Sequence, residues 1–442
     1  DNDIYTMIRN KLLEINKLKR SPQALFTLLN GPNGLLLSLK NDSYNVPASI
    51  ALRTCQNWMH VLNFELTEKK KGYYCDAHER EDVVQYRNEV FLPIMAQHEK
   101  KMRKYDYLEV NNTNLVLEMN MNEIILLAHD ESVVHVNDQG STYWADKNSN
   151  IKILLPKSKG ASNMISAFLN PKDGIMIDPN DNNNKSYKII EASRDGYWTN
   201  DDLVLQTDQV LTLFKKLHPH AKALIMFDNS QNHRASAPDA LVASRLNLSD
   251  GGKNVPKLRN TKWTDVNQVV HDQVMQLPDG TQKGVKRILM ERNKWDDTYT
   301  LTIAREILSK EPDFASQVCW LEEIIVGKHE QYIIFLPKCH PELNFIEYYW
   351  SYVKCDLRSQ LITTIQKLRE AVPIALMKCP IETIRRYYRH TLRFMSLYRR
   401  GIQGGPLADF IMRKYSSHRS IPEEMVMEEV ENEYNEYKNS KK

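Results

Sequence analysis

Three acidic side chains in this sequence stand where apolar stretches end. Asp130 follows the apolar run at residues 123–128, and Asp228 comes directly after the run at residues 221–227. Glu347 lies in the first turn of a predicted helix that follows a third apolar run. The ends of buried strands in one sheet lie side by side, so carboxylates at those ends can converge although they are far apart in the sequence.

Three carboxylates held close together repel one another and resist ionising unless cations lie among them. Mg²⁺ is the natural candidate, because it prefers hard oxygen ligands and is commonly held by a few carboxylates and substrate phosphates. Two such ions can activate a water or a 3′ hydroxyl and stabilise the leaving oxygen of an in-line phosphodiester displacement. The sequence therefore indicates phosphoryl transfer on nucleic acid, with two Mg²⁺ ions, or Mn²⁺ in their place, held by Asp130, Asp228 and Glu347.

Each acid also has a purely structural interpretation, which the residues alone leave open. An aspartate after a strand is frequently a turn residue or a helix cap. Asn344 and Glu347 have the spacing of a capping box, which would itself hold Glu347 in place. Histidines adjoin the acids, but their spacing matches no zinc signature, so we expect them to hydrogen bond locally or to face phosphate. These histidines are His129, His233 and His340.

The elements that must position these acids form an α/β domain predicted over residues 115–360. Short apolar runs bounded by turn residues predict strands, and apolar residues at helical spacing predict helices. The segment 331–354 contains a strand, a polar loop and a helix whose apolar side includes Trp350. An insertion is predicted at about residues 250–312, between two core elements. The predicted strands are 123–128, 132–136, 151–155, 174–177, 221–227 and 332–336, the predicted helices are 200–216, 236–247, 284–291 and 314–328, and an asparagine-rich loop is predicted at 178–185.

Helical regions flank this domain. Residues 1–66 contain three predicted helices and form either a helix-turn-helix-like DNA-binding module or a plain helical bundle. A charged connector is expected at 67–114, a helical region at 361–420 and an acidic tail at 421–442. The helix at 381–400 contains six arginines among aromatic residues, which suits phosphate contacts and base stacking, although its apolar stripe also fits a core. The candidate DNA-binding residues are Arg53, Lys354, Arg385, Arg386, Arg389 and Arg393.

The composition fits an intracellular protein that acts on nucleic acid. The 442 residues are 42% hydrophobic, which allows a substantial core, and no apolar run approaches the length of a membrane span. Six scattered cysteines with no CxxC pair fit a reducing compartment. The tail at 421–442 carries a net charge of −4, which leaves +7 on the remainder of a chain whose formal net charge is +3. A basic body of this kind is compatible with DNA as a partner, and no membrane partner is expected.

Three segments around the acids resemble the signature blocks of the mariner-like DDE transposases, especially the DDE superfamily endonucleases abundant in fungal genomes. They are HDES at 129–132, FDNSQNHR at 227–234 and LPKCHPELNFIEYYWSYVK at 336–354. The family's blocks read approximately D-E-S, D-N-x-x-x-H and L-N-P-I-E-x-x-W-x-x-x-K. Two departures matter, since Phe345 occupies the place of the family's proline and the insertion lengthens the interval between Asp228 and Glu347. Further similar segments lie at 70–87, 195–206, 244–256 and 413–422.

The resemblance implies a ribonuclease H-like catalytic domain, a mixed central sheet flanked by helices, in which Asp130, Asp228 and Glu347 are the metal-binding catalytic acids. It implies N-terminal helices that bind transposon ends, and an enzyme that cuts DNA at terminal inverted repeats and joins the freed 3′ ends to target DNA. Such enzymes act as oligomers in the nucleus, so double-stranded DNA and further copies of this chain are the expected partners. Two alternatives stay open: a transposase-derived DNA-binding protein that no longer cleaves, and a nuclease or resolvase that uses the same fold without transposition.

Overall fold

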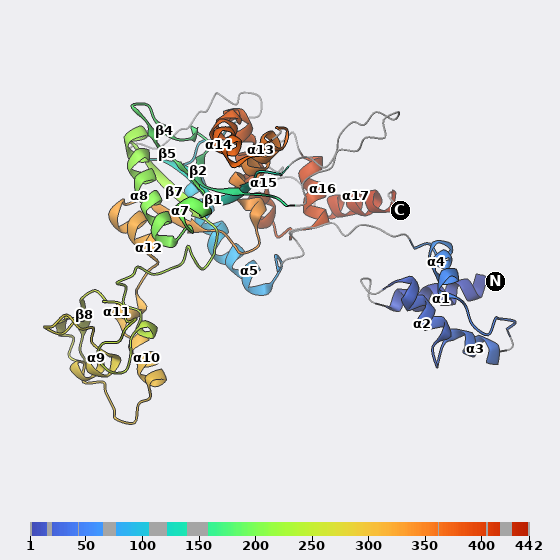
Figure 1. Ribbon diagram of the computed structural model, residues 1–442, viewed down its shortest axis with the longest axis horizontal. Helices are drawn as coiled ribbons and strands as arrows, with labels where there is room; N and C mark the ends of the chain where they lie inside the picture. Colours follow the sequence, from blue (N-terminus) through green and yellow to red (C-terminus); the bar gives the residue numbers. More distant parts are fainter. Residues whose placement is uncertain are drawn as a thin grey trace. The chain divides into compact units, whose positions relative to one another are not determined.

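The chain divides into two compact units, Asp1–Gly72 and Tyr73–Lys442, in the computed structural model (Figure 1). The structure describes residues 2–15, 20–42, 44–64, 77–105, 122–138, 158–360, 362–403, 405–415 and 427–440. Several predicted features lie outside these residues. They are the strand at 151–155, the boundary predicted between residues 66 and 67, parts of the connector, and most of the segment at 413–422.

Four helices pack together in the described part of the first unit, where the sequence predicted three. Their core includes Leu12, Leu25 and Cys55, which are completely buried. Ser21 caps the second helix, because its Oγ accepts a hydrogen bond from the backbone N–H of Ala24 at 3.1 Å. The additional helix has only seven residues, too few for a periodic pattern to be evident in the sequence. The helices are α1 (Asn2–Glu14), α2 (Pro22–Asn30), α3 (Leu35–Asn41) and α4 (Leu52–Val61).

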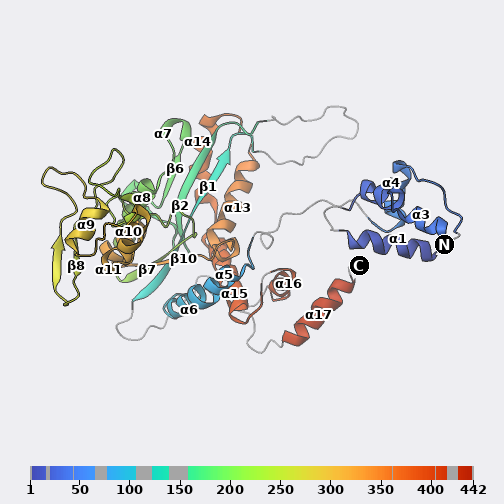
Figure 2. The same ribbon diagram turned by 90° about the horizontal axis from the view of Figure 1, so that it is seen from below.

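A mixed six-stranded sheet forms the centre of the second unit (Figure 2). Strand β1 (Glu123–His135) lies in its middle, antiparallel to β2 and parallel to β7. Strand β10 continues the sheet parallel to β7, while β3 and β6 both pair antiparallel with β2. The predicted fold class, an α/β ribonuclease H-like domain with a mixed sheet, is confirmed. The other strands are β2 (Ser162–Asn170), β3 (Gly174–Ile175), β6 (Tyr187–Ile190), β7 (Ala221–Phe227) and β10 (Tyr332–Phe335).

Two sequence predictions about the strands of this unit are wrong. The runs at 123–128 and 132–136 form a single strand of 13 residues, because the polar residues between them stay paired with β2. The predicted loop at 178–185 is a hairpin of β4 (Ile177–Asp178) and β5 (Asp181–Lys185). Asp178 itself shapes the turn, since its Oδ1 accepts a hydrogen bond from the backbone N–H of Asn180 at 3.0 Å.

Helices cover both faces of the sheet, and Figure 1 shows α8 and α12 on one side with α13, α14 and α15 on the other. Successive residues of β1 alternate between the two cores, with Leu126 and Ala128 facing one and Ile125 and Leu127 facing the other. No described helix is both long and apolar enough to cross a membrane. The helices are α5 (Glu81–Tyr86), α6 (Leu92–Glu99), α7 (Ala192–Asp195), α8 (Asn200–Leu217), α12 (Trp320–Glu322), α13 (Phe345–Arg358), α14 (Ile365–Lys378), α15 (Ile381–Arg399), α16 (Pro406–Lys414) and α17 (Met427–Ser440).

The chain between β7 and β10 contains an inserted subdomain with a core of its own. Leu246 and Leu289 are completely buried in this core. The buried guanidinium of Arg292 forms ion pairs with Glu311 at 3.1 Å and with Asp313 at 2.7 Å. The insertion therefore holds itself together without using the core of the sheet. Its elements are β8 (Thr261–Thr264), β9 (Val270–Gln273), α9 (Val285–Glu291), α10 (Leu301–Ser309) and α11 (Pro312–Ala315).

The two ends of the insertion meet at its root, where the backbone N–H of Trp320 donates to the carbonyl oxygen of Ala235 at 2.9 Å. The helix predicted at 236–247 is wrong, since only a short 3₁₀ turn forms there. Pro238 interrupts the helix, and the guanidinium of Arg245 satisfies nearby carbonyl groups in place of helical hydrogen bonds. The helix predicted at 314–328 is also broken, into the end of α11, the short α12 and a π-helical segment, Glu323–Lys328.

Candidate active site

Asp130 and Asp228 occupy matching positions on neighbouring parallel strands. The pairing of β1 with β7 extends to Ala128 opposite Met226. Two further residues in this register bring Asp130 opposite Asp228, at the end of β7 and within the longer β1. Both side chains are partly buried. The prediction that Asp130 ends a strand is wrong, because β1 continues to His135, but the register with β7 still brings Asp130 and Asp228 to the same edge of the sheet.

Helix α13 carries Glu347 to this edge. Trp350, one turn further along the helix, donates its indole Nε1–H to Oδ2 of Asp130 at 2.9 Å. At the start of the helix, the side-chain Nδ2 of Asn344 donates to the backbone carbonyl oxygen of His129 at 3.2 Å. These two hydrogen bonds, one before and one after Glu347 in the sequence, therefore fasten the first turns of α13 to β1.

The predicted capping box at this helix start is wrong. Asn344 stands at the N-cap position, but its side chain makes no capping hydrogen bond, because its amide is directed to β1. The next residue, Phe345, is completely buried and packs edge to face against Tyr388, with ring centroids 5.6 Å apart. Where the resembling family has a proline, this chain therefore has a core residue that joins α13 to α15.

The three acids share one electrostatic environment. Burial raises the pKa of Asp130 well above its ordinary value, and the charges of Glu347 and Glu131 raise it further. Glu347 is exposed at the wall of a cavity, yet the surrounding protein desolvates it and raises its pKa, an effect that Lys354 opposes and Asp228 increases. These charge effects place Glu347 close enough to Asp130 and Asp228 to repel them. Burial raises the pKa of Asp228 as well, but His233 and Ser230 lower it below its ordinary value. The structure thus brings Asp130, Asp228 and Glu347 together.

His233 links Asp228 to Glu131. Its Nδ1 forms an ion pair with the carboxylate of Asp228, and its Nε2 lies 3.4 Å from Oε1 of Glu131. Burial by itself lowers the pKa of His233, but the two carboxylates raise it to about 10, so the imidazole is protonated at neutral pH. Sequence reasoning did not place Glu131 in the site, and its position beside Asp130 in the HDES segment was the available signal.

The donor set fits divalent cations. The acids offer hard carboxylate oxygens, and the raised pKa values of Asp130 and Glu347 show a repulsion that a cation would relieve. Among the residues that the structure describes, the groups whose ligand atoms all lie within 4.8 Å of one another do not include this triad.

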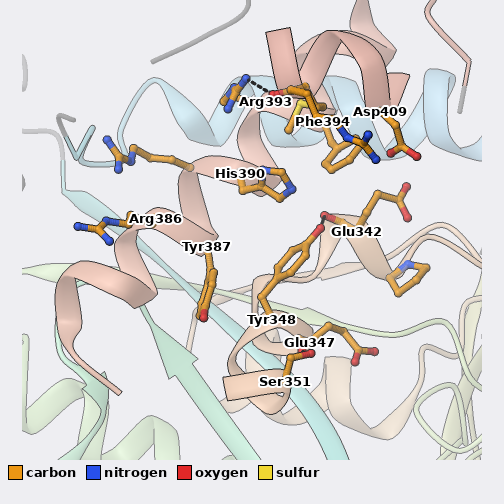
Figure 3. A pocket seen from close by; sticks show the side chains of 14 residues that line it. Glu342, Glu347, Tyr348, Ser351, Arg386, Tyr387, His390, Arg393, Phe394 and Asp409 are labelled. Carbon is orange, nitrogen blue, oxygen red and sulfur yellow. Dashed lines mark hydrogen bonds between the residues drawn. The ribbon is translucent and has the colours of Figure 1, made fainter. Parts of the chain in front are cut away.

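A cavity of about 820 Å³ opens beside Glu347, with walls formed by α13, α15 and α16 (Figure 3). Its lining combines arginines with aromatic rings, and Tyr348 and Tyr387 stack with ring centroids 5.8 Å apart. Burial lowers the pKa of His390 to about 4, so this imidazole is neutral at pH 7. Arginines beside stacked rings can contact phosphates and bases. The arginines of the lining are Arg386, Arg389, Arg393 and Arg413.

The predicted DNA-binding residues of α15 have different surroundings. Arg386 is exposed and Arg389 half-buried, and both line the cavity. Arg393 lines it too, but it is buried and donates to the carbonyl oxygen of Met412 at 3.0 Å. Arg385 donates to the carbonyl oxygen of Pro171 at 3.0 Å, next to β3, so its guanidinium fastens α15 to the sheet domain. We therefore leave Arg385 out of the proposed interface.

The two remaining candidates lie apart from α15. Lys354 is half-buried on α13, where its charge opposes the rise in the pKa of Glu347. Arg53 is exposed on α4 of the first unit, and its Nη1 donates to Oε1 of Gln56 at 3.1 Å. Lys354 therefore belongs to the surroundings of the acids, and Arg53 belongs to a different unit.

The fold and the placement of the acids define an α/β protein with a ribonuclease H-like sheet and an acidic cluster at one edge. Solved structures of the Mos1 mariner transposase are similar to this chain over about nine tenths of its length. A paired-end complex with the left transposon end has a TM-score of 0.37 and 10% identity, covering 89% of this chain and 96% of that one. A paired-end complex with Mn has a TM-score of 0.40 and 9% identity, covering 90% and 98%. No protein-family model and no curated protein sequence matches the chain.

Proposed function

We propose that this chain is a DNA transposase of the DDE type, a metal-dependent endonuclease and strand transferase that cuts at transposon terminal inverted repeats and joins 3′ ends to target DNA. The observation that carries the proposal is that Asp130 and Asp228 lie opposite each other at one edge of the sheet, with Glu347 close enough that its charge raises the pKa of Asp130 and the charge of Asp228 raises the pKa of Glu347. The three sequence segments that resemble transposase blocks contain these same acids, and they support DNA as the substrate.

In this proposal Asp130, Asp228 and Glu347 hold two Mg²⁺ or Mn²⁺ ions, which when bound activate the attacking oxygen and stabilise the leaving oxygen of the phosphodiester. Trp350 orients Asp130 through its indole N–H, which fixes one carboxylate oxygen toward α13. His233 orients Asp228 from the other side through Nδ1. Both residues position an acid and take no part in bond formation.

DNA would lie along the cavity beside Glu347. Arg386 and Arg389 are placed to neutralise backbone phosphates, and the stacked pair of Tyr348 and Tyr387 offers aromatic surface next to them. The first unit, with Arg53 on its surface, would bind the transposon ends as a helix-turn-helix-like module. A protein with this activity works in the nucleus and pairs two DNA ends as an oligomer.

The test is cleavage of DNA that carries the sequences flanking this gene, by purified full chain with Mg²⁺ or Mn²⁺. We expect nicking at the repeat ends by the wild type, and loss of nicking with retained DNA binding in Asp228→Asn. Asp208→Asn is a matched control, because Asp208 is also bound to a histidine, with its Oδ1 2.7 Å from Nε2 of His329. His329 precedes β10, which runs parallel to β7, so this pair lies at the opposite end of these strands from Asp228. Undiminished cleavage by Asp228→Asn would refute the site.

A catalytically silent DNA-binding protein derived from a transposase is the second candidate. One observation favours it: the carboxylate of Asp228, which a cation would need, is already in an ion pair with His233. This candidate predicts binding to the flanking DNA without nicking under both metals. Nicking of the flanking DNA by the wild type, with Mg²⁺ and with Mn²⁺, separates the two candidates.

A further inference from the structure

A second group of metal-ligating side chains meets in the interior of the same unit. His78, His340 and Glu342 are each at most 2% exposed, and each offers a ligand atom within 4.8 Å of the other two. His78 lies in the turn before α5, whereas the other two flank Pro341 in the loop between β10 and α13. The group is therefore assembled by the fold from distant segments, which is why no zinc-like spacing is visible in the sequence.

The hydrogen bonds of this group leave lone pairs unused. Oε1 of Glu342 lies 2.7 Å from Nδ1 of His340 and 3.0 Å from Nε2 of His78, and it accepts a hydrogen bond from the hydroxyl of Tyr398 at 2.7 Å. In contrast, Oε2 of Glu342 and Nε2 of His340 are buried without any hydrogen-bond partner. Buried polar atoms without partners are rare in folded proteins, and a bound ion is one established reason for them.

The surroundings of His78 match those of a metal-binding histidine. Its Nδ1 lies 2.6 Å from Oε1 of Glu79, which also forms an ion pair with Arg87 at 3.3 Å. An outer carboxylate that receives one ring N–H fixes the imidazole so that its other nitrogen faces the ion. In His78 that other nitrogen, Nε2, faces Glu342.

We propose that His78, His340 and Glu342 bind a divalent transition cation of the zinc class. Two imidazoles and one carboxylate are a donor set that zinc accepts and that Mg²⁺ does not favour. The hydroxyl of Tyr398, 3.4 Å from Nε2 of His78, or a water is placed to complete the coordination.

Such an ion would join three parts of the fold. Its ligands tie the turn before α5 to the loop that leads into α13, and Tyr398 adds the end of α15. Glu342 lies in the short 3₁₀ turn before α13, and Glu347 follows in the first turn of α13 itself. The site would therefore fix the start of α13, and its role is structural, separate from the ions proposed for the acids.

The test is the metal content of the full chain, purified without an affinity tag that binds metal and without chelators, and measured by inductively coupled plasma mass spectrometry. We expect about one zinc per chain. Glu342→Gln and His340→Ala should each lose most of this zinc. His329→Ala should keep it, because His329 is also buried beside a carboxylate but lies outside the group. Asp130→Ala and His233→Ala should keep it too, which separates this site from the acids.

A second measurement needs only the wild type, in case the variants do not fold. Zinc added to chelator-treated protein should raise the thermal unfolding temperature, and Co²⁺ in its place should give the visible absorption bands of a tetrahedral or five-coordinate site. A wild type that takes up no zinc and shows neither effect would overturn the proposal. Zinc retained in full by both folded variants, Glu342→Gln and His340→Ala, would overturn it as well.

Discussion

Replacing Trp350 by phenylalanine removes one hydrogen bond from the acid cluster while keeping an aromatic ring in place. The indole donates to Oδ2 of Asp130 at 2.9 Å, and the residue is otherwise buried in the core. A hydrogen bond to a charged group contributes about 1.5–3 kcal/mol, or roughly 10- to 150-fold in an equilibrium constant. This bond lowers the pKa of Asp130 against burial, so its loss disfavours the ionised carboxylate. We therefore expect the Mg²⁺ concentration for half-maximal DNA nicking to rise about 10- to 100-fold.

The assay is a Mg²⁺ titration of nicking by the wild type, Trp350→Phe and the control Trp295→Phe. Trp295 makes the same kind of bond in the insertion, from its Nε1 to Oδ1 of Asp297 at 2.8 Å, so this control removes a matched bond away from the acids. Higher pH should partly restore nicking by Trp350→Phe at low Mg²⁺, because it ionises the carboxyl group of Asp130, whose pKa the substitution raises. An unchanged Mg²⁺ dependence in folded Trp350→Phe would refute the reasoning.

Three further predictions concern DNA binding by α15, the ion pair of His233 and the packing of Phe345. Arg386→Ala should weaken binding to double-stranded DNA, measured by fluorescence anisotropy, and should reduce the salt dependence of that binding by the equivalent of about one phosphate contact. The control Arg385→Ala should lower thermal stability and leave the salt dependence of DNA binding unchanged. The pKa of His233 is raised from 6.5 to about 10, so its stabilising effect is complete below pH 6.5 and is lost as the pH rises through 10. The thermal unfolding temperature of the wild type should consequently fall more steeply between pH 6.5 and pH 10 than that of His233→Gln. Equal dependence of the two unfolding temperatures on pH would contradict the assignment. Phe345→Pro should lower the free energy of unfolding in urea by about 3 kcal/mol through lost core packing, with Phe345→Leu losing less than half as much; a proline variant as stable as the wild type would show that the ring is not needed.

The sequence was sufficient to locate β7, β10 and the first half of β1, because that information is local, but no strand was predicted at β2 or β6. The apolar runs that became β7 and β10 are short, continuous and bounded by turn residues, so their strand character does not depend on distant contacts. Asp228 directly follows β7 and is therefore constrained to one edge of the sheet, whereas Asp130 lies inside the longer β1 and is brought to that edge by the register of β1 with β7. Asp130 and Asp228 were therefore predictable as neighbours from the runs that precede them.

The features that the sequence did not reveal depend on partners far along the chain. The capping box at Asn344 was a sound local prediction, but the carbonyl group of His129 competed for the side chain and the tertiary contact prevailed. The pairing of His233 with Glu131 and the meeting of His78 with Glu342 have no counterpart in spacing or composition. The missing helix at 236–247 has the same explanation, because a side chain took over the carbonyl groups that the helix would have used.

The root of the insertion, where Ala235 and Trp320 share a backbone hydrogen bond, has a consequence for how such a protein can evolve. Because the first and last residues of the insertion lie side by side, the insertion affects the sheet domain only as a short loop would, whatever its own length. The entropic cost of closing a loop grows only slowly with length, and a domain that folds around its own core avoids most of that cost. Sequence can therefore be gained, exchanged or lost at this point without displacing β7 or β10. The long interval between Asp228 and Glu347 in the sequence accordingly places no limit on how close the two acids lie.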